Sequence, residues 1–297
     1  MNVQSMPVRE GCPDHAISEA GGVPSRNGSF GSKPMIERNP AASSIKGTTM
    51  TNGTAIVTGG AGTLGLAISR SLRDDGWSVI ILDRQEALAN FSPPDGMRAD
   101  ALDVTDFDAC RRYFAKLTEL SVLVNNAGMA RLSLVRDISL ENWNQVLDLN
   151  LTAPLVLTQL ATDLLVRSGH GAIVNIASIA GIRAGFGRVA YGASKAGIIQ
   201  LTRQTALEYA ALGVRCNAVA PGPVNSNMLR EQLSKADFDE YLDDIPFNRM
   251  AEPEEVGDAV AYLASKKSRY ITGQCLAVDG GFLAAGAGIK KAHKLVE

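Results

Sequence analysis

A chain of 297 residues, 45% of them hydrophobic, can bury one large core or two small ones. The formal net charge of −2, and the lack of an apolar run near the roughly 18 residues of a membrane span, give no support for a protein that binds nucleic acid or membranes. The four cysteines (Cys12, Cys110, Cys216 and Cys275) form no C-x-x-C pair and no metal-ligand spacing, so we expect reduced thiols, no metal site and a cytoplasmic protein.

Residues 1–49 are rich in Gly, Pro, Ser and Asn and show neither helical nor strand periodicity. We expect a disordered N-terminal extension, because such a segment cannot bury enough apolar surface to fold. It has no apolar signal region, and its acidic residues argue against a transit peptide. Since a strand is predicted four residues after Met50, a second hypothesis is that translation starts at Met50 and that the extension is not translated.

From residue 50 to residue 297, short apolar segments alternate with helical ones. The predicted strands, in chain order, are 54–58, 77–83, a third within 97–104, 121–126, 171–178, 214–222 and 273–281. The predicted helices are one that follows a Gly-rich loop and ends before Gly76, one capped by Thr105, two long ones at about 139–168 and 190–212, and one with Pro253 at its first position. Near-continuous apolar strands separated by helices are typical of a parallel sheet covered on both faces. The prediction is therefore a single α/β domain with a doubly wound, Rossmann-like fold and a parallel seven-stranded sheet.

The loop TGGAGTLG (58–65) follows the first strand and opens the first helix. Glycines at this place let the backbone approach a pyrophosphate, and the helix N-terminus supplies N–H groups and partial positive charge. Asp83, at the end of the second strand, is placed to accept hydrogen bonds from the hydroxyls of an adenosine ribose. The alternative is an ordinary strand-terminal aspartate in a turn. Strand, loop, helix and acid together predict a dinucleotide site.

Tyr191 and Lys195 lie four residues apart at the start of the helix 190–212, so they share one helical face. The three histidines of the chain (His15, His170 and His293) fall in no motif, so another group has to move protons if the protein does so. An ammonium about 4 Å from the phenol supplies about 4 kcal/mol at an effective dielectric constant near 20. That is enough to lower the pKa of a tyrosine from about 10 to about 7. The alternative is a surface pair with no catalytic role.

The chain resembles the short-chain dehydrogenase/reductase family in its single-domain form, over roughly residues 52–283. The resemblance rests on TGGAGTLG, LDV (102–104), NNAG (125–128), Asn150, Ser178, YGASK (191–195) and PGPVNS (221–226), all in family order. One departure is the middle glycine of the first loop, which stands at Gly62 where single-domain members have it at the position of Thr63.

The resemblance implies a role for each matching residue. Ser178 is expected to hold the substrate oxygen, Tyr191 to exchange its proton, Lys195 to lower the pKa of Tyr191 and bind the nicotinamide ribose, and Asn150 to organise a proton-relay water. The cofactor-binding residues that it implies, besides Tyr191 and Lys195, are Gly59, Gly62, Thr63, Leu64, Gly65, Asp83, Arg84, Asp103, Val104, Asn126, Ala127, Gly128, Pro221, Gly222, Val224 and Ser226. Asp103 is equally suited to a turn before Thr105, and Asn125 is expected to stabilise the sheet.

These residues predict an oxidoreductase that transfers a hydride between NAD(H) and a small-molecule secondary alcohol or ketone. NAD is expected rather than NADP because Asp83 would meet the 2′-phosphate of NADP. The alternatives are a reductase of carrier-linked 3-oxoacyl groups that uses NADPH, and a cofactor-sensing protein without turnover. Residues 223–250 are the expected substrate lid, and the family resemblance implies a homodimer or homotetramer. Three arginines near the predicted mouth (Arg131, Arg183 and Arg188) suggest either an anionic substrate group or, more simply, solvated loops.

Overall fold

The computed structural model describes residues 52–226, 242–286, 289 and 293. These residues belong to one compact unit, Thr49–Glu297. The predicted N-terminal extension 1–49 and residues 227–241 of the predicted lid lie outside the described residues.

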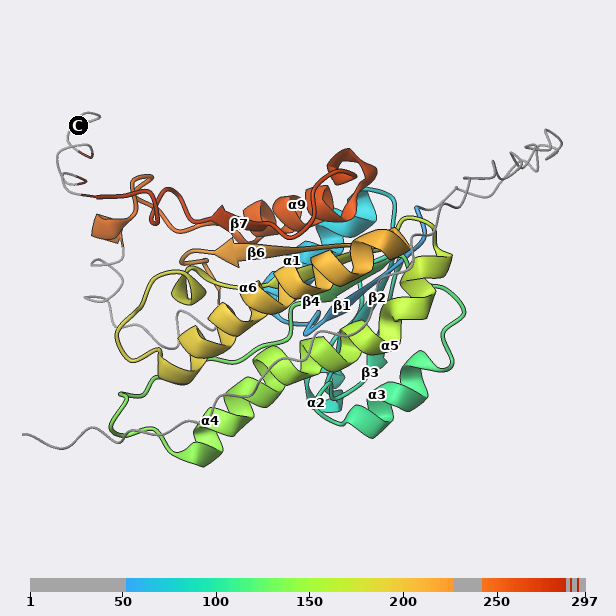
Figure 1. Cartoon of the computed structure of the whole chain (residues 1–297), viewed down its shortest axis with the longest axis horizontal. Helices are drawn as coiled ribbons and strands as arrows, with labels where there is room; N and C mark the ends of the chain where they lie inside the picture. Colours follow the sequence, from blue (N-terminus) through green and yellow to red (C-terminus); the bar gives the residue numbers. More distant parts are fainter. Residues whose placement is uncertain (1–51, 227–241, 287–288, 290–292, 294–297) are drawn as a thin grey trace, which may run out of the picture. The chain divides into compact units, whose positions relative to one another are not determined.

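Seven parallel strands form one sheet in the order β3-β2-β1-β4-β5-β6-β7, which confirms the predicted fold (Figure 1). The strands are β1 (Thr54–Thr58), β2 (Ser78–Asp83), β3 (Met97–Ala101), β4 (Val122–Asn125), β5 (Ala172–Ile176), β6 (Arg215–Pro221) and β7 (Cys275–Val278). The strand order reverses at β1, which has β2 on one side and β4 on the other. Ligands of open α/β sheets bind in the crevice outside the carboxyl ends of the strands at such a reversal.

Helices cover both faces of the sheet (Figure 1). The described helices are α1 (Thr63–Asp74), α2 (Gln85–Leu88), α3 (Phe107–Phe114), α4 (Leu140–Leu147), α5 (Ala153–Arg167), α6 (Val189–Tyr209) and α9 (Pro253–Ala264). Alternate residues of β1 point to opposite faces: Ala55 and Val57 pack in the cluster that includes α1 and α9, and Ile56 packs in the cluster that includes α3 and α5. The sheet is therefore buried on both sides, as its near-continuous apolar strands predict.

Two predicted helix ends can be compared with the structure. Gly76 has a φ of +89° directly after α1, which confirms its place beyond the end of that helix. The prediction that Thr105 caps α3 is wrong: Asp106 is the cap, and its carboxylate accepts from the backbone N–H of Ala109 at 2.9 Å. Thr105 instead donates from its own backbone and hydroxyl to Asp103, because a carboxylate two residues earlier competes for these donors.

The long helix predicted at 139–168 contains a change of winding. It runs as α4, then a π-helical turn at Asp148–Thr152, then α5. A π turn bonds residues five apart instead of four and is rare, so its position within an otherwise regular helix calls for a local cause. Asn150 lies at the middle of this turn and is 1% exposed.

This helical stretch, Leu140–Arg167, is long and apolar enough to cross a membrane by length and composition alone. Its apolar side chains pack inside the protein. Five residues of α5 belong to the core cluster on one face of the sheet: Ala153, Leu157, Ala161, Leu164 and Leu165. We therefore regard it as a helix that covers the sheet.

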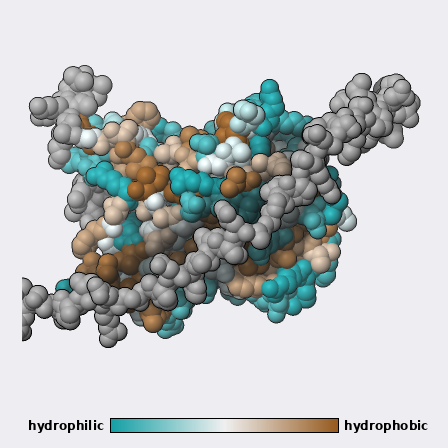
Figure 2. Space-filling view, in the orientation of Figure 1, coloured by the Kyte–Doolittle hydropathy of each residue, from teal (hydrophilic) through white to brown (hydrophobic). Residues whose placement is uncertain are grey.

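Figure 2 shows the face that carries α4, α5 and α6, where apolar residues lie among polar ones and gather at the lower left, near α4. Exposed large apolar side chains on these helices are Leu140, Leu155 and Leu207. The family resemblance implies that long helices pair between subunits, and the homodimer or homotetramer stays a prediction.

Candidate active site

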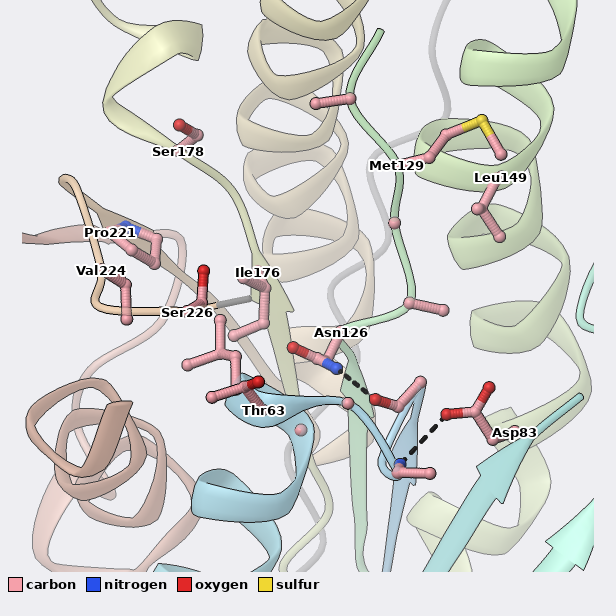
Figure 3. A pocket seen from close by; sticks show the side chains of 18 of the residues that line it. Thr63, Asp83, Asn126, Met129, Leu149, Ile176, Ser178, Pro221, Val224 and Ser226 are labelled. Atoms are coloured by element: carbon pink, nitrogen blue, oxygen red, sulfur yellow. Dashed lines mark hydrogen bonds between the residues drawn. The ribbon is translucent and has the colours of Figure 1, made fainter. Parts of the chain in front are cut away.

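A cavity of about 1010 Å³ opens at the carboxyl ends of the strands, where the strand order reverses. It is lined by nearly every residue to which the sequence assigns a role: Gly59, Gly62, Thr63, Leu64, Gly65, Asp83, Arg84, Asp103, Val104, Asn126, Ala127, Gly128, Ser178, Tyr191, Lys195, Pro221, Gly222, Val224 and Ser226. Among the predicted catalytic and cofactor-binding residues, Asn150 is the one that does not line it. Ser178 and Asp83 lie at opposite sides of the cavity (Figure 3).

The Gly-rich loop packs tightly on the strands behind it. Gly59 has a φ of +62°, and a Cβ added there would lie 2.9 Å from the Cα of Ala127. A Cβ at Gly65 would lie 2.2 Å from the carbonyl oxygen of Gly59, so α1 begins in direct contact with the loop. By contrast, a Cβ at Gly62 would meet only the Gly59 oxygen, at 3.5 Å. Gly62 is the N-cap of α1, and Thr63 is its first residue. Gly60 is also tightly packed, since a Cβ there would lie 2.9 Å from the Ile81 side chain. The glycine at the departing position, Gly62, is therefore the one in this loop without a close contact.

The carboxylate of Asp83 is held at the end of β2 by two backbone donors. The N–H of Ala61, in the Gly-rich loop, donates to one oxygen at 3.0 Å (Figure 3). The N–H of Arg84 donates to the other at 2.9 Å. Each oxygen keeps a lone pair, so the carboxylate can accept further hydrogen bonds from the cavity side. The acid is thus more than a turn residue, because it fixes the loop and lines the cavity at once.

The NNAG segment after β4 is tied to the end of β1. The hydroxyl of Thr58 accepts from the N–H groups of Asn126 and Ala127, both at 3.0 Å, and the Asn126 side chain donates to the Thr58 carbonyl at 2.8 Å. Asn125 donates to Asn175 across β4 and β5 at 2.7 Å, as expected for a residue that stabilises the sheet. These bonds place Ala127 and Gly128 at the wall of the cavity.

Lys195 is the buried cation of the site, with 4% of its surface exposed. Its Nζ donates to the carbonyl oxygen of Ile176, at the end of β5, at 2.7 Å. It lies 5.7 Å from the centre of the Tyr191 ring, as the four-residue spacing predicts. Burial lowers the pKa of Lys195 from 10.5 to about 8. A cation thus stands beside the phenol inside the cavity.

Ser178 follows β5 and caps a single 3₁₀ turn, Ile179–Gly181. Its Oγ accepts from the N–H of Ala180 at 3.1 Å, which leaves the hydroxyl proton available for a ligand. The turn then packs directly on α6, because a Cβ added at Gly181 would lie 2.5 Å from the carbonyl carbon of Lys195. Ser178 and Lys195 are therefore held against each other through the backbone.

Asn150 is joined to both sides of the cavity wall. Its Nδ2 donates to the carbonyl of Met129 and to Ser194 Oγ, at 2.9 and 3.0 Å, and its Oδ1 accepts from the N–H of Met129 at 2.9 Å. The Ser194 hydroxyl in turn donates to the carbonyl of Tyr191 at 2.8 Å. These bonds explain the π turn, which brings Asn150 to the segment after NNAG and to α6 together.

The remaining predicted residues are placed as follows. Asp103 accepts from both the N–H and the hydroxyl of Thr105, at 2.8 and 2.6 Å, so the turn interpretation is confirmed while the residue also lines the cavity. Arg131 donates to Asn142 at 2.7 Å, and Arg183 lies over the ring of Phe282. Neither of these two arginines lines the cavity, whereas Arg188 does.

Sequence reasoning did not assign a role to Thr58 or Ser194. Both are hydroxyls within a quoted motif: Thr58 precedes the first glycine of TGGAGTLG, and Ser194 precedes Lys195 in YGASK. Nothing in their spacing shows that they link separate segments. Their hydrogen bonds reach residues 68 and 44 positions away in the chain, which only the folded structure reveals.

The cavity fits a nicotinamide dinucleotide. The first-turn N–H groups of α1 have no acceptor within the helix and face the cavity side of Gly62, where a pyrophosphate needs donors. Asp83 and Lys195 both line this cavity. The Asp83 carboxylate can accept hydrogen bonds from ribose hydroxyls, and the Lys195 ammonium can donate them, so the two groups suit the two riboses of the cofactor.

Known proteins resemble this chain over most of its length. A family model described as enoyl-(acyl carrier protein) reductase matches residues 59–283. The 3-oxoacyl-[acyl-carrier-protein] reductase FabG of Rickettsia bellii is 38% identical over 234 residues, which cover 77% of this chain and 96% of that protein. Nodulation protein G of Azospirillum brasilense is 36% identical, with 76% and 96% covered.

Solved structures agree with these relatives. The structure of gox2181 superposes with a TM-score of 0.76 at 31% identity and covers 80% of this chain and 97% of that one. A protein assigned as a short-chain alcohol dehydrogenase from Sinorhizobium meliloti gives 0.75 at 31% identity, with 80% and 98% covered. Fold, cavity and relatives together show that the chain is an oxidoreductase of the short-chain dehydrogenase/reductase family.

Proposed function

We propose that this chain reduces 3-oxoacyl groups to 3-hydroxyacyl groups, reversibly, with NAD(H) as the hydride partner. The observation that supports the chemistry is the meeting of Ser178, Tyr191 and Lys195 in one cavity with a dinucleotide loop. The substrate class is supported by the identity of 38% to a 3-oxoacyl-[acyl-carrier-protein] reductase over nearly its whole length.

The residues that would hold the cofactor follow from the cavity wall. The Gly-rich loop and the start of α1 would bind the pyrophosphate, Asp83 the adenosine ribose, and Lys195 the nicotinamide ribose. Ser226, which also lines the cavity, stands where the carboxamide would be expected. When bound, the nicotinamide ring donates or accepts the hydride.

The protein's own groups would manage the proton. The Ser178 hydroxyl donates to the substrate oxygen and holds it beside the phenol. Tyr191 gives its proton to that oxygen during reduction and removes it during oxidation. Lys195 stabilises the phenolate: at 5.7 Å from the ring centre, a unit charge contributes about 3 kcal/mol at an effective dielectric constant near 20. The nearby ammonium therefore lowers the pKa of the Tyr191 phenol, because it favours the charged form.

Asn150 is placed to extend the proton path. A Cβ added at Gly128 would lie 3.2 Å from Asn150 Oδ1 and 3.6 Å from Lys195 Nζ, so both polar atoms border the same small region. After accepting from Met129, Oδ1 keeps one lone pair for a water. We infer that such a water passes the proton from the Tyr191–Lys195 pair toward solvent.

A second candidate is a dehydrogenase of simple secondary alcohols, which the likeness to a short-chain alcohol dehydrogenase structure favours. The discriminating measurement follows nicotinamide absorbance with a 3-oxobutanoyl thioester and with a ketone of the same length that lacks the acyl group. A higher kcat/KM for the thioester supports the proposal. A higher value for the ketone would replace the proposal by the second candidate, and no turnover of either would favour a cofactor-sensing protein.

Changing Ser178 to alanine is expected to lower kcat by about 10²-fold, because one positioned donor to a developing oxyanion is lost. Ser265→Ala is the matched control: Ser265 also caps a 3₁₀ turn, its Oγ accepts from Lys267 at 3.2 Å, and it lies outside the cavity. Steady-state rates of both variants separate the loss of a catalytic hydroxyl from the loss of a side chain that caps a turn. If both variants kept wild-type rates, Ser178 would have no part in the chemistry.

Changing Asp83 to serine is expected to lower the ratio of kcat/KM for NAD(H) over NADP(H) by about 10-fold or more, since a close like-charge pair costs several kcal/mol. In the unmodified chain the carboxylate would face the 2′-phosphate, whereas serine can donate to it. Asp100→Ser is the control, because Asp100 pairs with Arg98 on β3 and does not line the cavity. Equal kcat/KM for both cofactors in the unmodified protein would show that Asp83 does not reach the ribose.

A further inference from the structure

Arg188 occupies a fixed place at the entrance of α6. It is the N-cap of that helix, and its carbonyl accepts from Gly192 at 2.6 Å. Its backbone also forms an isolated parallel bridge with Ser133, so the loop before α6 is anchored to the segment after NNAG. The backbone from which the side chain projects is therefore well defined.

The guanidinium of Arg188 lies over the catalytic phenol. Its Cζ is 5.6 Å from the centre of the Tyr191 ring, and the half-buried side chain lines the cavity. Within residues 52–226 and 242–286, no carboxylate forms an ion pair with it. Tyr191 thus has two cations near its ring, Lys195 at 5.7 Å and Arg188 at 5.6 Å.

Arg183, in the same loop, provides a contrast. Its guanidinium lies 5.5 Å from the centre of the Phe282 ring, it is exposed, and it does not line the cavity. The two arginines therefore make the same kind of contact with an aromatic ring, and only one of them faces the reacting groups.

The position of Arg188 is electrostatically unfavourable in the isolated protein. A helix N-terminus carries partial positive charge, so an acidic or neutral cap is preferred there. Arg188 adds a full positive charge at the same end, and Lys195 lies one to two turns further along the helix. An oxygen-bearing ligand group beside the guanidinium would offset this excess of positive charge, because hydrogen bonds from a charged donor are stronger than neutral ones.

We propose that Arg188 binds the acyl oxygen at C1 of a 3-oxoacyl substrate while the C3 oxygen lies at Ser178 and Tyr191. This inference rests on the proposed function and refines it, since it explains how 3-oxoacyl compounds are chosen over simple ketones. The closeness of the guanidinium to the phenol restricts the recognised oxygen to one a few bonds from the reacting carbonyl. The carboxylate of a free 3-oxo acid and the carbonyl of a thioester both provide such an oxygen.

The test compares Arg188→Gln with the control Arg183→Gln on three substrates: 3-oxobutanoate, the N-acetylcysteamine thioester of 3-oxobutanoate, and 2-pentanone. Loss of a hydrogen bond from a charged donor is expected to lower kcat/KM of Arg188→Gln about 10–100-fold for an acyl substrate, mainly through KM. For 2-pentanone, which has no acyl oxygen, any loss comes through the nearby phenol and falls on kcat, so the loss of kcat/KM for an acyl substrate should exceed it by about 10-fold or more. Arg183→Gln should resemble the unmodified protein throughout. A larger loss for the free acid identifies a carboxylate, and a larger loss for the thioester identifies a thioester carbonyl.

Two outcomes would overturn the assignment. An equal loss on all three substrates would mean that Arg188 acts only through Tyr191, and no loss on any would mean that it is a solvated loop residue.

A binding measurement separates this inference from the proposed function. The Kd of 3-hydroxybutanoate for the complex with NADH, a pair that cannot react, is measured by NADH fluorescence. Arg188→Gln should weaken this binding about 10-fold or more, and Arg183→Gln should not. If the unmodified protein turned over none of the substrates yet showed this difference, the proposed function would fail and the role of Arg188 would stand. Equal Kd values in all three proteins would sink the assignment of Arg188 whatever the turnover.

Discussion

Replacing Tyr191 with phenylalanine is expected to lower kcat by about 10⁴-fold, at the upper end of what a positioned acid–base group contributes. The ring and its contacts with Arg188 and Lys195 remain, so binding of the cofactor should be nearly intact. The lost hydroxyl is the group that we propose to exchange a proton with the substrate oxygen. Single-turnover rates and NADH fluorescence titration measure the two effects separately.

Tyr209→Phe is the matched control for this prediction. Tyr209 is the last residue of the same helix, and its hydroxyl shares a hydrogen bond with Thr162 at 2.8 Å, away from the cavity. Both substitutions remove one phenolic oxygen from α6, so a general effect on the helix would show in both. The mechanism is untenable if the Tyr191 variant keeps most of its kcat.

Replacing Lys195 with methionine is expected to lower kcat by about 10³-fold. Loss of the roughly 3 kcal/mol that the ammonium contributes to the phenolate accounts for about 10²-fold, and weaker positioning of the nicotinamide ribose for the remainder. The same change should leave the free energy of unfolding at neutral pH unchanged or higher. Removing a buried charge that has no anionic partner relieves a desolvation cost, and only the bond to the Ile176 carbonyl is lost.

The pH dependence of stability gives this prediction a second readout. The pKa of Lys195 is about 8 in the folded chain and 10.5 without burial, so between these values the unfolded state binds more protons. The free energy of unfolding therefore rises with pH across this window, by about 3 kcal/mol from this group. Below pH 8 Lys195 is protonated in both the folded and the unfolded state, so its contribution to the free energy of unfolding is constant. Urea unfolding of the unmodified protein should show the rise, and the methionine variant should lack it. An identical rise in both proteins would mean that Lys195 is not buried as a cation.

The sheet and the main chemistry of the site could be predicted from local patterns. Near-continuous apolar strands predict the parallel sheet, and the position of the Gly-rich loop directly after β1 predicts where the cavity opens. Tyr191 and Lys195 were paired by a spacing of four, which holds in any helix. In each case the physical cause lies within a few residues of the feature.

Features caused by contacts distant in sequence could not be predicted in the same way. The π turn exists because the Asn150 amide bonds Met129 and Ser194, on two other segments, while the flanking Leu149 and Leu151 are ordinary helix formers. The orientation of Arg188 toward Tyr191, and of Arg183 away from it, depends on how one loop is folded. For the cap of α3, Thr105 and Asp106 are both suitable residues, and the carboxylate of Asp103 decided between them by engaging Thr105.

Gly181 has a consequence for redesign of the enzyme. Any side chain at residue 181 would collide with the backbone of Lys195. The turn that carries Ser178 and the helix that carries Tyr191 therefore form one rigid unit. Residues 182–187 follow this unit, and most of them are exposed. New substrate preferences can therefore be sought by randomising this outer loop, while residue 181 is kept as glycine so that Ser178 and Tyr191 stay in place relative to each other.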